Sequence, residues 1–207
     1  MQENPHSLKL LHLVFVCFFL LFYLCLSIAV ANQLIKFMKE REIRNILVIR
    51  FRRVGDSVLS MSLCHTLRKS FPNAKIDFVI NKGIDSLYYN HPHVDNLIVF
   101  DKDENDSILK YLSKVRTVMR AKHYDLIVDM RSTIKTMLFS LFSLRTPYRL
   151  GRKKWYTGIL LTHTTRNSLA DSGSVPEQNL SLLKPLEKFA DMQYTTDFRL
   201  YVSDEEK

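Results

Sequence analysis

ILVIRFRRVGDSVLSMSLCHTLRKSFP, residues 46–72, decides the fold of this chain. It contains an apolar run, a short basic turn with Gly55 and Asp56, and an amphipathic segment that ends at Phe71-Pro72. A strand that leads through a glycine-containing turn into a helix is the first unit of a Rossmann-like domain. The stretch therefore predicts such a domain, with a carboxylate in its first turn.

Apolar runs alternate with helical patterns along the rest of the chain. We expect strands at 46–51, 76–80, 96–100 and 126–129, helices at 56–70, 84–90, 107–121, 133–144 and 180–191, and a Ser-rich loop at 166–178. Such alternation is typical of a parallel sheet with right-handed crossovers and helices on both faces. The predicted fold class is α/β, a Rossmann-like three-layer domain with a parallel sheet.

Residues 13–31, LVFVCFFLLFYLCLSIAVA, carry no charge. At about 1.5 Å per residue, a helix of this length nearly spans a hydrocarbon core of about 30 Å. Only Lys9 precedes it, whereas four cations follow: Lys36, Lys39, Arg41 and Arg44. The positive-inside rule therefore predicts a single-pass anchor in the inner membrane, with the folded domain in the cytoplasm. A signal peptide cleaved after Ala29-Val30-Ala31 is the competing interpretation, and it would make the chain an exported binding protein.

Asp56 has two interpretations. As a general base, it would accept a proton from a substrate hydroxyl within hydrogen-bond reach. As an ordinary aspartate at a helix start, it would cap the helix. The turn has only one of the glycines of a dinucleotide fingerprint, so an NAD-type site is disfavoured.

Four segments in order resemble the N-terminal half of glycosyltransferase family 9, the lipopolysaccharide heptosyltransferases. They are ILVIRFRRVGDSVLSMSLCHTLRKSFPNAKIDFVIN, HPHVDNLIVFDK, YDLIVDMRSTIKT and YRLGRKKWY. The resemblance implies the acceptor half of a GT-B fold, with ADP-heptose bound by a C-terminal domain and Asp56 as the catalytic base. It further implies inverting transfer of a heptose to the inner core of lipopolysaccharide, on an acceptor of the lipid A–Kdo type.

We expect an N-terminal tail at 1–12, a transmembrane helix at 13–31, a basic linker at 32–45, the acceptor-binding domain at 46–195 and a linker to the donor domain from 196 to 207. As such a fragment, the chain is expected to be inactive alone. The alternative is a non-catalytic, membrane-tethered Rossmann-like module that binds an anionic glycolipid or a partner chain.

The predicted acceptor-binding residues are Arg52, Arg53, Gly55, Arg131, Lys135 and Arg152. Arg52 and Arg53 depart from the small residues that the family usually has there. They would keep Asp56 ionised and attract an acidic acceptor, or fill the space that a sugar needs. On a helix, Arg131 and Lys135 would share a face and clamp a carboxylate or phosphate, or lie on an ordinary solvated face. For Asp129 and Arg131 at the end of the fourth predicted strand, we expect a structural ion pair at least as much as a substrate contact.

The net charge of +9 favours anionic partners such as a glycolipid or a membrane. No nucleic-acid motif is present, so no nucleic-acid partner is predicted.

The basic run at 149–156 contains the only Trp and suits a bilayer interface, a sugar face or a plain surface loop. Asp101-Lys102-Asp103 matches the D-x-D motif of metal-dependent transferases, but a solvated loop is the favoured interpretation. His91-Pro92-His93 is predicted to form a turn. No metal and no cofactor is predicted, and three scattered cysteines fit a reducing compartment.

Overall fold

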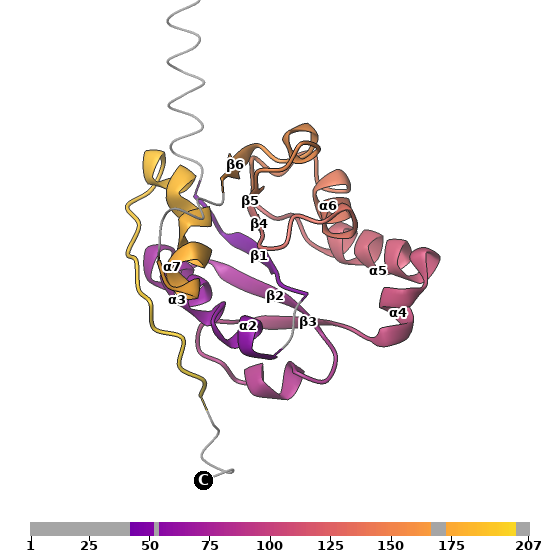
Figure 1. Ribbon diagram of the computed structural model, residues 1–207, viewed down its shortest axis with the longest axis horizontal. Helices are drawn as coiled ribbons and strands as arrows, with labels where there is room; N and C mark the ends of the chain where they lie inside the picture. Colours follow the sequence, from indigo (N-terminus) through magenta and orange to yellow (C-terminus); the bar gives the residue numbers. More distant parts are fainter. Residues whose placement is uncertain (1–41, 52–53, 167–172, 202–207) are drawn as a thin grey trace, which may run out of the picture. The chain divides into compact units, whose positions relative to one another are not determined.

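The computed structural model describes residues 42–51, 54–166 and 173–201, and a six-stranded parallel sheet lies at its centre (Figure 1). The strands are β1 (Asn45–Ile49), β2 (Lys75–Asn81), β3 (Asn96–Phe100), β4 (Leu126–Asp129), β5 (Tyr148–Arg152) and β6 (His163–Thr165). Their spatial order is β3-β2-β1-β4-β5-β6, and every neighbouring pair is parallel. This is the strand order of a doubly wound Rossmann domain, so the predicted α/β class is confirmed.

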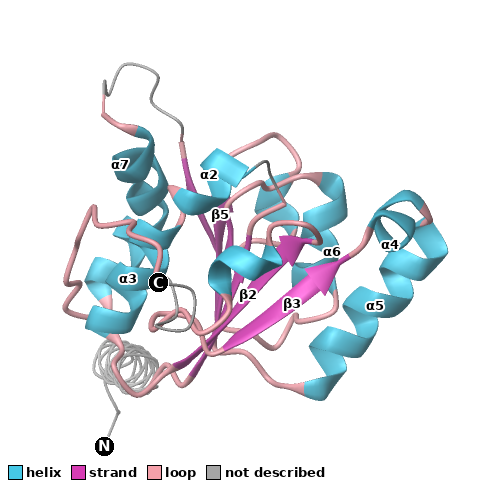
Figure 2. Cartoon of the chain, turned by 90° about the horizontal axis from the view of Figure 1, so that it is seen from below, coloured by secondary structure: helices cyan, strands magenta, loops and turns pink. Residues whose placement is uncertain are grey.

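Helices cover both faces of the sheet. The α-helices are α2 (Val54–Val58), α3 (Met61–Ser70), α4 (Lys102–Asp106), α5 (Ile108–Ala121), α6 (Ile134–Leu141) and α7 (Val175–Leu180). Short 3₁₀ helices are η1 (Asp85–Tyr88), η2 (Thr157–Ile159) and η3 (Ser181–Lys188). Figures 1 and 2 show α3 and α7 on one face and α5 and α6 on the other, which gives three layers.

Strand β1 supplies side chains to a hydrophobic core on each face. Ile46 and Val48 belong to the cluster that includes residues of α3, and Leu47 and Ile49 belong to the cluster that includes residues of α5. All four are fully buried. Burying such a side chain stabilises a fold by about 1.5–3 kcal/mol, which explains why the strand is a continuous apolar run rather than an alternating one.

Three predicted helices differ from those observed. The helix expected at 56–70 breaks between α2 and α3, where the Ser60 hydroxyl donates to the Asp56 carbonyl oxygen at 2.7 Å and competes with the backbone ladder. The segment expected at 84–90 is only the 3₁₀ helix η1. The one expected at 180–191 is η3, which contains Pro185, a residue without the backbone N–H that an α-helix needs.

Two strands and two helix starts were missed. The basic run at 149–156 was not predicted to contain a strand, but Tyr148–Arg152 forms β5, and β6 beside it was not predicted either. The acidic stretch after β3 is the helix α4 rather than a loop, with Asp101 and Glu104 forming a capping box. Of the loop expected at 166–178, residues 167–172 lie outside the described part, and α7 begins at Val175.

The expected tail, membrane helix and most of the basic linker fall within residues 1–41, which lie outside the described part of the chain, as do Arg52 and Arg53. Among the residues that are described, no helix is both long enough and apolar enough to span a bilayer. At the other end, residues 196–201 form no strand, and the segment joins the domain through Thr195, whose N–H donates to Thr66 Oγ1 at 3.1 Å.

Candidate functional site

The candidate site lies where the strand order reverses, between β1 and β4. Ile49 at the end of β1 pairs with Asp129 at the end of β4, so the loops that follow the two strands emerge side by side. In open α/β sheets, ligands bind at this switch point, beyond the carboxyl ends of the strands. The first loop leads to Gly55 and Asp56, and the second carries Arg131.

Asp56 is the third residue of α2, inside the helix rather than at its N-cap, so the simple capping interpretation is wrong. Its side chain retains 31% of its exposure, and Oδ1 lies 3.8 Å from Nη2 of Arg50. Arg50 itself is buried, directly after β1. The Asp56 carboxylate therefore lies beside a buried guanidinium and stays accessible from the solvent side.

Gly55 has open space at the position where a side chain would begin. A Cβ added at this residue would meet no heavy atom within 4 Å, so neither packing nor backbone approach requires glycine there. Packing against another element therefore does not fix the residue before Asp56.

Arg131 and Lys135 do not form the predicted helical clamp. Arg131 lies in the loop before α6, which begins at Ile134, and its Nη1 donates to the Phe51 carbonyl oxygen at 2.7 Å. Lys135 lies on α6, and its Nζ donates to the Asn105 carbonyl oxygen at 2.7 Å. The expectation of a shared helical face is therefore wrong: Arg131 joins the two switch-point loops, whereas Lys135 reaches toward α4.

Asp129 organises the loop after β4. Its Oδ1 accepts hydrogen bonds from the backbone N–H groups of Arg131 at 2.9 Å and Ser132 at 2.7 Å. Ser132 adopts a φ of 48°, an uncommon conformation for a residue with a side chain, and these bonds hold it there. Complete burial raises the pKa of the Asp129 carboxyl, and hydrogen bonds from Thr136, Ser132 and Arg131 oppose that shift. An aspartate at the end of an apolar strand was the sequence signal for this role.

Arg152 is turned away from the switch point. Its Nη1 donates to Ser181 Oγ at 2.9 Å, and its Nη2 donates to the Gln178 carbonyl oxygen. Burial lowers the pKa of its guanidinium. Arg152 thus attaches α7 and η3 to the end of β5, while Trp155, three residues later, is 94% exposed.

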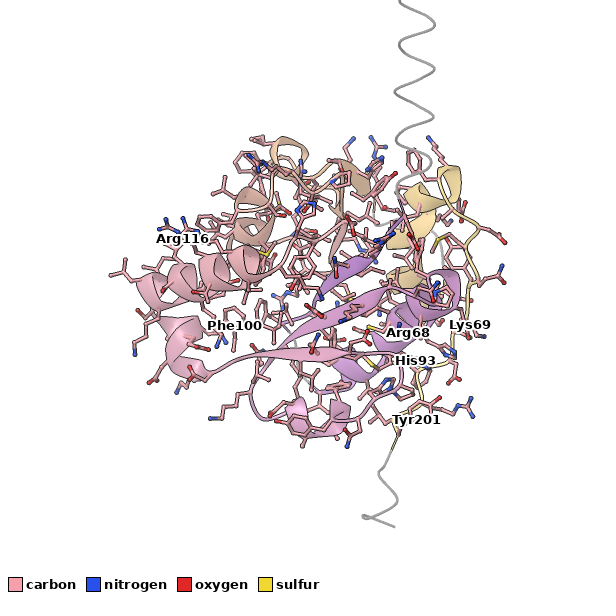
Figure 3. All side chains as sticks on the ribbon, turned by 180° about the vertical axis from the view of Figure 1, so that it is seen from behind. Arg68, Lys69, His93, Phe100, Arg116 and Tyr201 are labelled. Carbon is pink, nitrogen blue, oxygen red and sulfur yellow. The ribbon has the colours of Figure 1, made fainter. Side chains whose placement is uncertain are left out.

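His91 and His93, which were predicted to be turn residues, form a cluster with His65 of α3. His65 stacks on His93 with ring centroids 4.0 Å apart, and His91 meets His93 edge-on at 5.3 Å. Tyr201 packs edge-on against His93 at 5.8 Å, and Figure 3 shows these two side chains together near Arg68. Over the described ranges, no three His, Cys, Asp or Glu side chains are placed to hold a metal ion.

The fold and the switch-point carboxylate together define a Rossmann-like domain with an acidic residue in its first strand-to-helix connection. Known proteins with similar sequences and structures support the family resemblance of this chain. The chain is 27% identical over 139 residues to lipopolysaccharide heptosyltransferase 3 of Escherichia coli K12, a match that covers 64% of this chain and 39% of the relative. No protein-family model matches.

Solved structures agree with this match. A glycosyl transferase family 9 protein from Veillonella parvula superposes with a TM-score of 0.69 at 20% identity, over 80% of this chain and 47% of the other. The ADP-heptose lipopolysaccharide heptosyltransferase II of E. coli has a TM-score of 0.59 at 25% identity, over 78% of this chain and 48% of the other. The resemblance to glycosyltransferase family 9 is confirmed, and this chain spans less than half the length of these relatives.

Proposed function

We propose that this chain is the acceptor-binding half of a heptosyltransferase-type glycosyltransferase, with Asp56 as its general base. The observation that carries the proposal is the partly exposed Asp56 carboxylate at the switch point, 3.8 Å from buried Arg50, in a fold that heptosyltransferases share. In the full reaction, heptose passes from ADP-heptose to the inner core of lipopolysaccharide, and a donor domain outside this chain holds the nucleotide sugar.

The proposed reaction is a single displacement. An acceptor hydroxyl attacks the anomeric carbon from the face opposite ADP, a carbon–oxygen bond forms as the bond to the diphosphate breaks, and Asp56 takes the hydroxyl proton. Any carboxylate is a weak base toward a neutral hydroxyl group in the ground state. Proton transfer late in the step, when the attacking oxygen has become acidic, overcomes this weakness.

We further propose where this chain lies in the cell. Residues 13–31 anchor the chain as a single pass in the inner membrane, with the domain facing the cytoplasm where nucleotide sugars are made. The lipid A–Kdo type acceptor is anionic and lies in that membrane. The net charge of +9 supports an anionic partner of this kind.

The test joins this chain to the donor domain of a heptosyltransferase and measures heptose transfer from ADP-heptose to a lipid A–Kdo acceptor. Asp56→Asn keeps the size of the side chain and removes the base, so turnover is expected to fall about 10²- to 10⁴-fold. Asp103→Asn, an exposed carboxylate on α4, is the matched control and is expected to leave turnover unchanged. Full activity in the Asp56 variant would remove this residue from the mechanism.

A further inference from the structure

Large apolar side chains are exposed beyond the carboxyl ends of β4 and β5. Trp155 is 94% exposed, Ile159 82% and Ile134 73%. Three lysines accompany them and are also exposed: Lys135, Lys153 and Lys154. We call these six residues the Trp155 surface.

Two hydrogen bonds connect the loops that carry residues of the Trp155 surface. The Tyr156 hydroxyl donates to the Ser132 carbonyl oxygen at 2.9 Å, and Lys154 Nζ donates to the Arg131 carbonyl oxygen at 3.2 Å. These bonds hold the Trp155 loop against the segment that enters α6 at Ile134. Trp155 and Ile134 therefore extend from two connections that touch each other.

Two lysines of this surface donate hydrogen bonds to backbone carbonyl groups. Lys135 donates to the Asn105 carbonyl oxygen and Lys154 to the Arg131 carbonyl oxygen, and a neutral carbonyl group does not cancel an ammonium charge. Tryptophan and lysine together are typical of a protein surface at a bilayer interface. The tryptophan ring lies among the lipid headgroups, and the lysines contact anionic lipid. Protein–protein interfaces are depleted in lysine, so charge complementarity favours a lipid surface over a protein partner.

We propose that the Trp155 surface docks on an anionic bilayer, with Trp155, Ile159 and Ile134 entering the headgroup region. The surface belongs to the carboxyl edge of the sheet, the same edge that carries Asp56, so docking brings the switch point to the membrane. The purpose of this docking rests on the proposed function, because a lipid-borne acceptor then meets the catalytic carboxylate at the bilayer surface.

Trp155 is the only tryptophan of the chain, so its fluorescence reports on this surface alone. The full chain is reconstituted with vesicles of phosphatidylcholine, either pure or containing phosphatidylglycerol, and emission and quenching by brominated lipid are recorded. We expect a blue shift and quenching with the anionic vesicles, and water-like emission with the pure phosphatidylcholine vesicles. An N-terminal anchor acts equally in both, so the difference isolates the surface.

Charge reversal completes the test. Lys153→Glu with Lys154→Glu is expected to weaken the docked state at least about tenfold, since each cation near an anionic surface contributes about 1 kcal/mol. Lys184→Glu, an exposed lysine on η3, is the matched control and is expected to keep the blue shift. Water-like Trp155 emission with anionic vesicles would overturn the proposal. Neither ADP-heptose nor acceptor is present, so this outcome is independent of the transfer assay.

Discussion

Protonation of His93 is expected to destabilise this fold, because the ring is packed among groups that oppose a positive charge. Both ring nitrogens are buried without a hydrogen-bond partner, and the ring stacks on His65 at 4.0 Å. Burial lowers the pKa of His93 from 6.5 to about 4, and the nearby His65, His91 and Arg68 add to this shift, while Asp197 opposes it.

The size of the effect follows from the two pKa values. The difference between 6.5 and about 4 is about 2.5, and each unit corresponds to about 1.36 kcal/mol, so the ceiling is about 3.4 kcal/mol. Because the ring is only partly buried, solvent screening reduces the expected loss to about 1–2 kcal/mol. A lowered folded-state pKa means that this stability is fully present above pH 6.5 and is lost as the pH falls from 6.5 through about 4.

Equilibrium urea unfolding, followed by circular dichroism between pH 7.5 and pH 4, measures this loss. His93→Phe keeps an aromatic ring between its neighbours and removes the titrating group. It is expected to match the original free energy of unfolding at pH 7.5 and to exceed it by about 1–2 kcal/mol near pH 4. His123→Phe, an exposed histidine before β4, is the control and should follow the original profile.

A His93→Phe profile that falls with pH as steeply as the original would refute this reasoning. His65 and His91, whose pKa values burial also lowers, leave a smaller residual dependence in the variant. Hydrogen exchange of residues 192–201 gives a local check. This segment holds Tyr201 against His93, so its amides should lose protection first as the pH falls.

Two further predictions concern the frame of the site. Gly151→Ala would place a Cβ 2.5 Å from the Ser132 Oγ, so the free energy of unfolding should fall by about 1–3 kcal/mol. Gly158→Ala, which has open space around it, should change the free energy of unfolding little. Urea unfolding at pH 7.5 compares the two variants. Asp101→Ala removes the N-cap of α4 and should cost about 1 kcal/mol in the same assay, while Asp103→Ala, exposed and outside the cap, should cost less. An equal effect within either pair would contradict its argument.

Local patterns predicted strands β1 to β4 and missed β5 and β6, the two strands at one end of the sheet. The strands at 96–100 and 126–129 have the predicted bounds, because both are apolar runs with clear ends. Strand β5 was missed because two of its five residues are arginines, which indicate a surface loop when burial is judged from composition. Pairing with β4 makes this stretch a strand, and Arg152 at its end bonds Gln178 of α7; neither contact is visible in the local sequence.

The candidate site was likewise predicted only in part. The strand and turn at 46–56 place Asp56 at the carboxyl end of β1, and sequence alone indicated a carboxylate there. Two residues predicted to bind the acceptor also connect distant segments of the chain: Arg131 bonds Phe51, and Arg152 bonds Ser181. The partner of a long cationic side chain depends on segments far away in the chain, so no local pattern could assign it.

The sequence by itself determined the class of this domain and the place of its acidic turn, because both follow from short-range periodicity and from the chemistry of one strand-to-helix connection. Only the tertiary structure decided that buried Arg50 faces Asp56, that three histidines share one contact cluster, and that Trp155 stays in solvent. These features arise where separate segments pack against one another, and packing sets the burial, the neighbouring charge and the free space that give a side chain its function.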